Sequence, residues 1–150
     1  MNIYIGADHR GFELKGRLEA QLKDEGYTVI DVGDEKLIKE DDYTDFARAV
    51  AENVAQDPAQ RRGIVICGSG FGADIAANKV KGIRSALAMS PDHIYQGRHD
   101  DDVNVLAIAA DFVDAGVVGN MLKVFLTTPF AKEERYARRL GKIADIENGK

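Results

Sequence analysis

The only cysteine of the chain lies where an apolar run meets a glycine-rich loop. In the segment IVICGSGFGADIAANK, residues 64–79, the run ends on Cys67, glycine alternates with other residues from 68 to 72, and a helix-like stretch follows. The positive end of a helix favours an ionised sulfur, and a thiolate can attack carbon or remove a proton. The segment therefore predicts a reactive thiol. The plain alternative is a small core residue, because free cysteine is often buried.

The loop after Cys67 has the composition of an anion site. Glycines let the backbone turn sharply and approach a ligand, because no Cβ intervenes. The N–H groups of Gly68, Gly70, Phe71 and Gly72 and the Ser69 hydroxyl are then candidate donors at a helix start. Ser69 is otherwise a simple turn residue. The missing Gly-Lys-Ser/Thr and the G-x-G-x-G spacing argue against a nucleotide-binding domain.

The elements that must position this loop alternate along the chain. Apolar runs predict strands at 2–6, 27–33, 63–68, 84–89 and 104–110. Helical spacing predicts helices at 11–25, 44–57, 73–80, 91–98, 114–129 and 132–147, with Gly26 as a stop signal and Thr44 as an N-cap. This alternation predicts one α/β domain over residues 1–150, with a five-stranded parallel sheet covered by helices on both faces.

Polar residues follow the first and third predicted strands. In parallel sheets ligands bind at the carboxyl ends of the strands. We therefore expect Asp8, His9, Cys67 and Ser69 to face one crevice. Asp8 can also cap the helix that follows, and His9 can be an ordinary loop histidine.

Composition excludes several classes of function. With 45% hydrophobic and 30% charged residues the chain is typical of a globular protein. A net charge of -5 argues against nucleic acid or an anionic membrane as the main partner. A single cysteine excludes an internal disulfide and fits the reducing cytoplasm. We find no apolar run near the roughly 20 residues of a membrane helix, and no signal peptide in MNIYIGADHR.

Five segments together resemble the ribose-5-phosphate isomerase B / galactose-6-phosphate isomerase family. They are GADHRGFELK, DYTDFA, GIVICGSGFGADIAANKVKGIRSAL, NVLAIAADFV and ERYARRLGKI. The resemblance runs from residue 2 to about residue 146. It implies a Rossmann-like α/β/α fold and aldose–ketose isomerisation of a sugar phosphate without metal or nucleotide. It also implies homodimers or dimers of dimers, with each site built from two subunits.

The resemblance also implies roles for particular residues. Cys67 matches the thiolate that moves a proton between C1 and C2, and Ala73 stands where other members carry a glutamate base. Asp8 and His9 match a clamp on substrate hydroxyls. The chemistry needs a base and preorganised donors for the enediolate oxygen, which the loop from 68 to 72 can provide.

The last predicted helix contains two arginines that match the family's phosphate ligands. Arg135 and Arg139 are four residues apart, which puts both on one helical face. Arginine suits bidentate contact with phosphate. The ordinary alternative is that the two arginines form a solvent-exposed basic face of the helix and bind no ligand.

Three positions depart from the family pattern. Asp100 stands where many members have the histidine that opens the sugar ring, and Asp101 stands where an asparagine is usual. His99 is one residue earlier, about 100° away around a helix. Asp111 replaces an arginine that many members carry after the fifth strand.

These departures leave two interpretations of the substrate. Asp100 can take over ring opening, with a pKa adjusted by Asp101 and Asp102 and with Asp101 in contact with substrate. Alternatively the substrate is open-chain, such as a tetrose phosphate, and the acidic run is a solvated helix end. The alternative function is a catalytically weak sugar-phosphate sensor or a non-catalytic partner subunit of the same fold.

Overall fold

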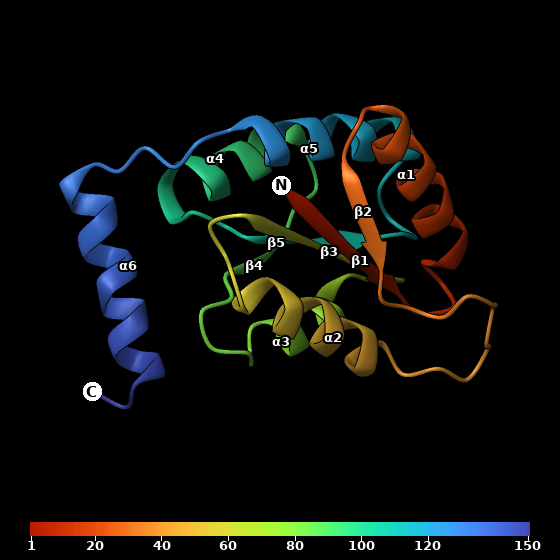
Figure 1. Ribbon diagram of the computed structural model, residues 1–150, viewed down its shortest axis with the longest axis horizontal. Helices are drawn as coiled ribbons and strands as arrows, with labels where there is room; N and C mark the ends of the chain where they lie inside the picture. Colours follow the sequence, from red (N-terminus) through yellow and green to blue (C-terminus); the bar gives the residue numbers. More distant parts are fainter.

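Five parallel strands form the central sheet of the protein, which is described by a computed structural model of residues 1–150. The strands lie in the order β2-β1-β3-β5-β4 (Figure 1). Their bounds are β1 Asn2–Ala7, β2 Thr28–Asp31, β3 Arg61–Cys67, β4 Ser85–Leu87 and β5 Val105–Ala109. Apolar residues, many of them β-branched, fill the central strands, as expected for a sheet that is buried on both faces.

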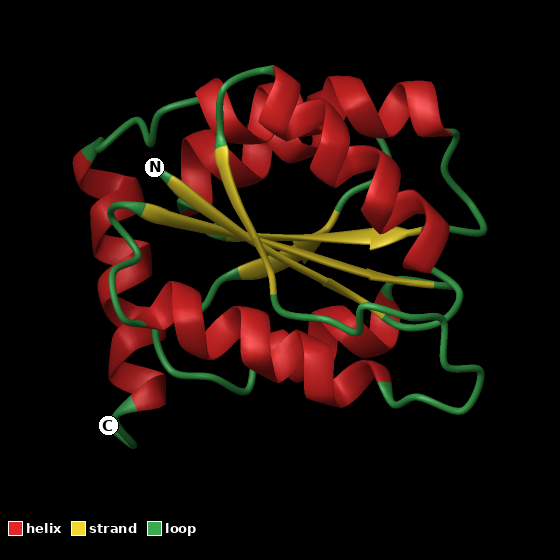
Figure 2. Ribbon diagram, turned by 45° about the vertical axis from the view of Figure 1, so that its right-hand side comes forward, coloured by secondary structure: helices red, strands yellow, loops and turns green.

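Helices cover both faces of this sheet, so the predicted three-layer α/β/α fold is confirmed (Figure 2). The helices α1 (Phe12–Asp24), α4 (Pro91–Asp101) and α5 (Ala115–Thr127) pack on one face. The helices α2 (Tyr43–Ala55) and α3 (Phe71–Ala77) pack on the other. The last helix, α6 (Glu134–Glu147), runs along one side of the molecule (Figure 1).

The two-residue period of β3 decides where the thiol points. Ile64 and Ile66 are buried in the cluster beneath α1, α4 and α5. Val65 and Cys67 are buried in the cluster beneath α2 and α3, because successive side chains of a strand point to opposite faces. Removing each such Ile or Val side chain from water contributes about 1.5–3 kcal/mol to folding. Packing therefore fixes the register that turns the sulfur toward α2 and α3.

The chain leaves β1 and β3 toward opposite faces of the sheet. These strands are neighbours, with Ala7 aligned to Ile66. After β1 the chain continues into α1, whose Leu14 and Leu18 pack on one face, whereas α3 after β3 packs on the other. Such a divergence opens a crevice at the carboxyl edge of the sheet, where ligands of this fold class bind.

Several predicted boundaries were wrong by a few residues. Thr44 is not an N-cap, because α2 begins at Tyr43 and the N-cap position is Asp42. The helix after the glycine loop begins at Phe71 rather than residue 73. Helix α4 continues to Asp101 instead of ending near residue 98. Gly26 does end the first helix, with the positive φ of 87° that glycine tolerates.

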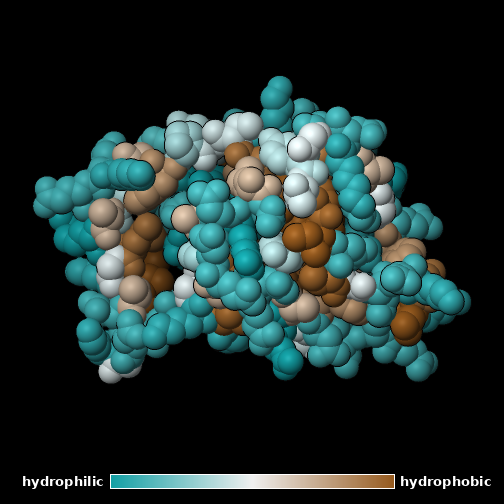
Figure 3. Space-filling model, in the orientation of Figure 1, coloured by the Kyte–Doolittle hydropathy of each residue, from teal (hydrophilic) through white to brown (hydrophobic).

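Helix α6 is attached to the body mainly at its two ends. The N–H of Ala131 donates to the carbonyl of His99 before the helix, and the N–H of Gly82 donates to Glu147 Oε1 at its end. Tyr136 is its only buried residue, whereas Ile143 and Ile146 are exposed. Apolar surface lies on the side of α6 that faces the body (Figure 3). None of the helices has the length and apolarity that crossing a bilayer requires.

Candidate active site

Cys67 ends β3 at the edge of a cavity of about 440 Å³. The side chain is 4% exposed and packs in the apolar cluster beneath α2 and α3. Its Sγ accepts a hydrogen bond from the N–H of Gly70 at 3.2 Å. Asp8 and Ser69 line the same cavity. Cys67 thus combines a buried side chain with a place in the lining of a hollow at the carboxyl edge of the sheet.

The backbone after Cys67 needs glycine at two positions. Gly70 has a φ of 77°, and a Cβ there would collide with Leu87 Cδ1. This conformation brings the Gly70 N–H back onto the sulfur. A Cβ on Gly72 would lie 2.5 Å from Cζ of Tyr43, so the first turn of α3 can approach that ring only without a side chain. Gly70 therefore places the N–H that donates to the sulfur, and Gly72 lets α3 pack against the Tyr43 ring in the cavity wall.

The loop also exposes the start of a helix to the cavity. Helix α3 begins at Phe71, and the first N–H groups of a helix have no acceptor within it. Ser69 is exposed, and its hydroxyl makes no hydrogen bond within the chain. The Phe71 side chain is exposed as well, and this predicted residue lines not the Cys67 cavity but a smaller adjoining one, which Ser69 also lines. Donors for an anionic oxygen therefore lie beside the thiol.

Asp8 closes the turn between β1 and α1. Its Oδ1 accepts from the N–H of Arg10 at 3.0 Å and of Gly11 at 3.1 Å, although Gly11 occupies the N-cap position. The residue is 6% exposed and lines the Cys67 cavity. No hydrogen bond within the chain reaches its Oδ2. One carboxylate oxygen thus fixes the turn while the other is left for a ligand.

His9 does not face the Cys67 cavity, contrary to the prediction. Its N–H donates to Asp41 Oδ1 at 3.0 Å, and its Nδ1 lies 2.7 Å from the same oxygen. Asp41 therefore turns the ring toward a neighbouring cavity of about 550 Å³, which His9 lines together with Arg10. The same carboxylate oxygen thus contacts both the backbone and the ring of His9.

Four residues of the Cys67 cavity were not among the predicted site residues. They are Arg10, Tyr43, Asp111 and Phe112. Arg10 and Asp111 form an ion pair across the loops that follow β1 and β5. The sequence signal for both was their place just after a predicted strand. Tyr43 is the first residue of α2 and has no comparable signal.

The remaining predicted residues lie at the opposite edge of the sheet. Asp100 and Asp101 end α4 shortly before β5 begins, whereas Cys67 is aligned with Ala109 at the end of β5. The four residue steps of β5 correspond to about 13 Å at 3.3 Å per residue. Arg135 and Arg139 are on α6, which packs against α4. Within one chain these residues do not reach the thiol.

A compact network surrounds Asp100. His99 Nδ1 lies 2.6 Å from Asp100 Oδ1, and the His99 ring stacks on Tyr95 with centroids 5.3 Å apart. Arg135 donates to the Tyr136 hydroxyl at 2.7 Å, and its guanidinium lies 4.5 Å from the centre of that ring. The guanidinium of Arg139 lies 5.8 Å from the same ring. The two arginines therefore share one aromatic support.

This network sets the ionisation of Asp100. The hydrogen bond with His99, followed by that from Tyr136 and the charge of Arg135, lowers the pKa of Asp100. Burial and the bond to Asp100 raise the pKa of Tyr136, so this phenol stays protonated. The acidic neighbours were predicted to adjust Asp100, and this prediction was wrong. Its carboxylate is held as an anion by donors from α4 and α6.

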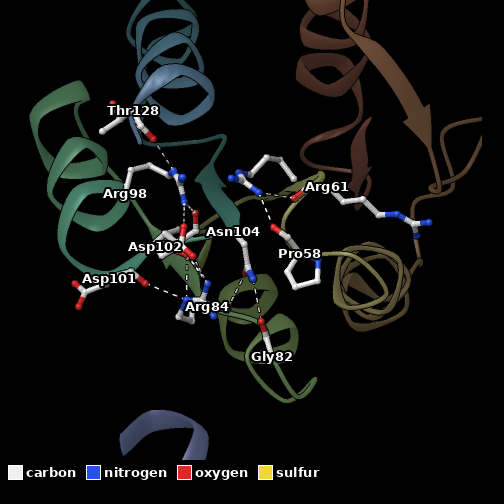
Figure 4. Close-up of polar contacts among 11 residues, drawn as sticks. Pro58, Arg61, Gly82, Arg84, Arg98, Asp101, Asp102, Asn104 and Thr128 are labelled. Carbon is white, nitrogen blue, oxygen red and sulfur yellow. Dashed lines mark hydrogen bonds and ion pairs between the residues drawn. The ribbon is translucent and has the colours of Figure 1, made fainter. Parts of the chain in front are cut away.

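Arginines neutralise the last acidic residue of the run. Asp102 adopts a left-handed conformation with a φ of 47°, and it accepts from Arg84 at 2.9 Å and Arg98 at 2.7 Å (Figure 4). Asp101 bonds to Arg84 only through its carbonyl, and its carboxylate points away from this cluster (Figure 4). The three aspartates therefore end α4 in defined contacts, and only Asp101 is exposed.

The geometry at the carboxyl edge can remove a proton from carbon and stabilise an oxyanion. No group of three or more histidine, cysteine or acidic side chains is arranged to hold a metal ion. Cys67, Asp8 and Ser69 line one cavity, so a thiol, a carboxylate and a hydroxyl belong to the same site. These are the parts that a proton transfer next to a carbonyl group requires.

Comparisons with known proteins connect this site to one family. A family model described as Ribose/Galactose Isomerase matches residues 3–143. Ribose-5-phosphate isomerase B of Mycobacterium tuberculosis is 38% identical over 147 residues, which cover 98% of the chain and 90% of the relative. A probable ribose-5-phosphate isomerase B of Mycoplasma genitalium is 38% identical over 146 residues, covering 97% and 95%.

Solved structures agree with the sequence comparison. Ribose-5-phosphate isomerase B from Mycoplasma genitalium with bound ribulose-5-phosphate has a TM-score of 0.95 at 37% identity, covering 99% of the chain and 97% of the neighbour. The enzyme from Clostridium thermocellum has a TM-score of 0.93 at 41% identity, with 99% of both chains covered. At these identities the likeness extends beyond the fold.

Proposed function

The chain belongs to the ribose/galactose isomerase family and is an aldose–ketose isomerase of sugar phosphates, and we propose that Cys67 is the base of its reaction. One observation supports this role above all. Cys67 lines a cavity at the carboxyl edge of the sheet, and its Sγ accepts the Gly70 N–H at 3.2 Å. This N–H therefore donates to the atom that takes up the proton in the proposed reaction.

The proposed reaction is a proton shuttle between adjacent carbons. The Cys67 thiolate removes the proton from C2 of the open-chain aldose, and the electron pair of that C–H bond forms the enediolate. The thiol then returns the proton to C1, which gives the ketose, while a hydroxyl proton moves between the two oxygens. The Ser69 hydroxyl and the N–H groups at the start of α3 stabilise the enediolate. A free thiol stays reduced in the cytoplasm, where we expect the enzyme to act.

We further propose that a second copy of the chain completes the site. Asp100, Asp101, Arg135 and Arg139 lie at the amino edge of the sheet, about 13 Å along β5 from Cys67. Two exposed aromatic residues lie near this site: Phe112 lines the Cys67 cavity, and Phe71 lines an adjoining one together with Phe112. Large exposed aromatics beside a half-built site are typical of a surface that another subunit covers. In this arrangement the arginines of one chain bind the phosphate in the other chain's cavity.

The charge state of Asp100 favours an open-chain substrate. Ring opening needs a group that exchanges a proton near neutral pH. The contacts of Asp100 lower its pKa, so it is a weak base and does not carry a proton at neutral pH. A tetrose esterified on O4 has no free hydroxyl with which to close a furanose ring. Such a substrate needs no ring-opening group, and Asp100 then serves as a hydrogen-bond acceptor for a sugar hydroxyl.

A substrate panel tests this proposal. We expect a tetrose 4-phosphate to be isomerised with a kcat/KM at least tenfold above that of ribose 5-phosphate, because ribose 5-phosphate is mainly cyclic in solution. The measurement is initial rate with four- to six-carbon aldose and ketose phosphates, each matched with its unphosphorylated sugar. A preference for ribose 5-phosphate would instead mean that the site opens the sugar ring, and the open-chain proposal would be wrong. Absence of turnover and of solvent proton exchange with every sugar phosphate would support a sensor.

A further inference from the structure

We propose that Arg10 binds the anionic group of the substrate in the Cys67 cavity and is a specificity-determining residue of this enzyme, with Asp111 as its positioning residue. The inference rests on the proposed function of this cavity. It goes beyond that function because it assigns charge recognition to the chain that contains the thiol.

Charge balance is the first argument. Arg10 is the only cationic side chain that lines the Cys67 cavity. Two carboxylates, Asp8 and Asp111, line it as well, and the proposed base adds a third negative charge in its active form. A sugar phosphate and its enediolate are anions, so apart from Arg10 they would meet only negative charges in this cavity. Without a cation this repulsion opposes binding of the substrate.

The position of the guanidinium is the second argument. It packs against the glycine loop beside the thiol, since a Cβ on Gly68 would lie 2.5 Å from Arg10 Nε and 2.6 Å from Asp111 Oδ2. Arg10 also lines the neighbouring cavity that contains His9, so it forms the wall between the two hollows. A group bound there can contact the guanidinium from either side.

The unused donors of Arg10 are the third argument. Its Nη2 pairs with Asp111 Oδ2, and the side chain makes no other hydrogen bond or ion pair within the chain. A guanidinium has five N–H donors, so most of them are free to bind a phosphate in bidentate fashion. The side chain is 58% exposed, as a ligand contact requires, while Asp111 at 34% anchors one end of it.

The test compares Arg10→Ala with Arg10→Lys and with a double variant that carries the arginine at position 111 instead of position 10. We expect Arg10→Ala to raise KM for the phosphorylated substrate about tenfold at low ionic strength, with kcat changed less than about threefold, because binding is lost equally in the ground and transition states. The inhibition constant of inorganic phosphate should rise by a similar factor. Arg10→Lys should recover part of the affinity. In the double variant Arg10→Ala/Asp111→Arg the facing loop provides the cation, and KM should return to within about threefold of the parent.

Controls distinguish a role of Arg10 in binding the substrate from a purely structural role. They also distinguish failure of the Arg10 proposal from failure of the proposed function. Arg48→Ala removes an arginine that is 71% exposed on α2, and it should leave KM unchanged. If Arg10 only ties two loops together, Arg10→Ala would lower the melting temperature while KM and phosphate inhibition stay at parent values, and the proposal would be wrong. If the parent isomerises no sugar phosphate, calorimetric titration of parent and Arg10→Ala with inorganic phosphate still tests the Arg10 site by itself.

Discussion

Replacing Cys67 with alanine should lower kcat by about 10³-fold or more while the protein keeps its fold. A positioned base contributes on the order of 10²–10⁴ in rate, and the cavity contains no second thiol or imidazole to replace it. The loss of one buried sulfur should cost only about 1 kcal/mol of stability. The measurement is kcat with the best substrate of the panel, together with a thermal unfolding curve.

Cys67→Ser is the matched control for the geometry of the loop. A serine hydroxyl can still accept the Gly70 N–H that donates to Sγ at 3.2 Å, so the glycine loop should keep its shape. A hydroxyl is far less acidic than a thiol and does not provide the anionic base at neutral pH. We therefore expect this variant to bind inorganic phosphate as the parent does and to be inactive. Substantial turnover by a folded Cys67→Ser enzyme would remove the basis of the mechanism.

Mixing two inactive variants should restore activity if the site is shared between subunits. The first variant is Cys67→Ala, and the second is Arg135→Ala/Arg139→Ala, which we expect to lose about 10²-fold or more in kcat/KM for the phosphorylated substrate. In a hybrid dimer one site contains both defects and the other contains neither. Random reassociation of equal amounts makes about half of the dimers hybrid, so about a quarter of the parent activity should return.

The control for this experiment is a mixture that cannot regenerate an intact site. Cys67→Ala mixed with Cys67→Ser has no thiol in any subunit and should stay inactive. Activity of the productive mixture no greater than the average of its two components would mean that the arginines of α6 do not act in a partner's site. A single-subunit mass in solution would lead to the same conclusion.

The position of the thiol could be predicted from the sequence because it depends on local rules. An apolar run followed by alternating glycines indicates a strand that ends at Cys67, and the alternation of strands and helices indicates a parallel sheet. The rule that ligands bind at the carboxyl edge then places Asp8 near Cys67, and both line one cavity. Each step used neighbouring residues or general topology, so no long-range contact had to be known.

Other features depend on contacts between distant segments. Asp41 holds the ring of His9, which lines the neighbouring cavity, although 32 residues separate the two in the chain. The Arg10–Asp111 pair joins loops about one hundred residues apart in sequence. The charge of Asp100 is set by Tyr136 and Arg135 as well as by His99. A run of three aspartates looks uniform in the sequence, yet in the folded protein the Asp100 carboxylate contacts His99, whereas the Asp102 carboxylate contacts Arg84 and Arg98.

Hydrogen exchange between substrate and solvent tests most directly whether the Cys67 sulfur moves the proton. The parent enzyme is incubated in D₂O with its best substrate, and deuterium at C1 and C2 of the recovered sugar phosphates is followed by NMR. A thiol that exchanges with solvent during the enediolate's lifetime should leave deuterium at these carbons with the parent enzyme and essentially none with Cys67→Ser. Deuterium incorporation by Cys67→Ser at the parent's rate would contradict the assignment of the base.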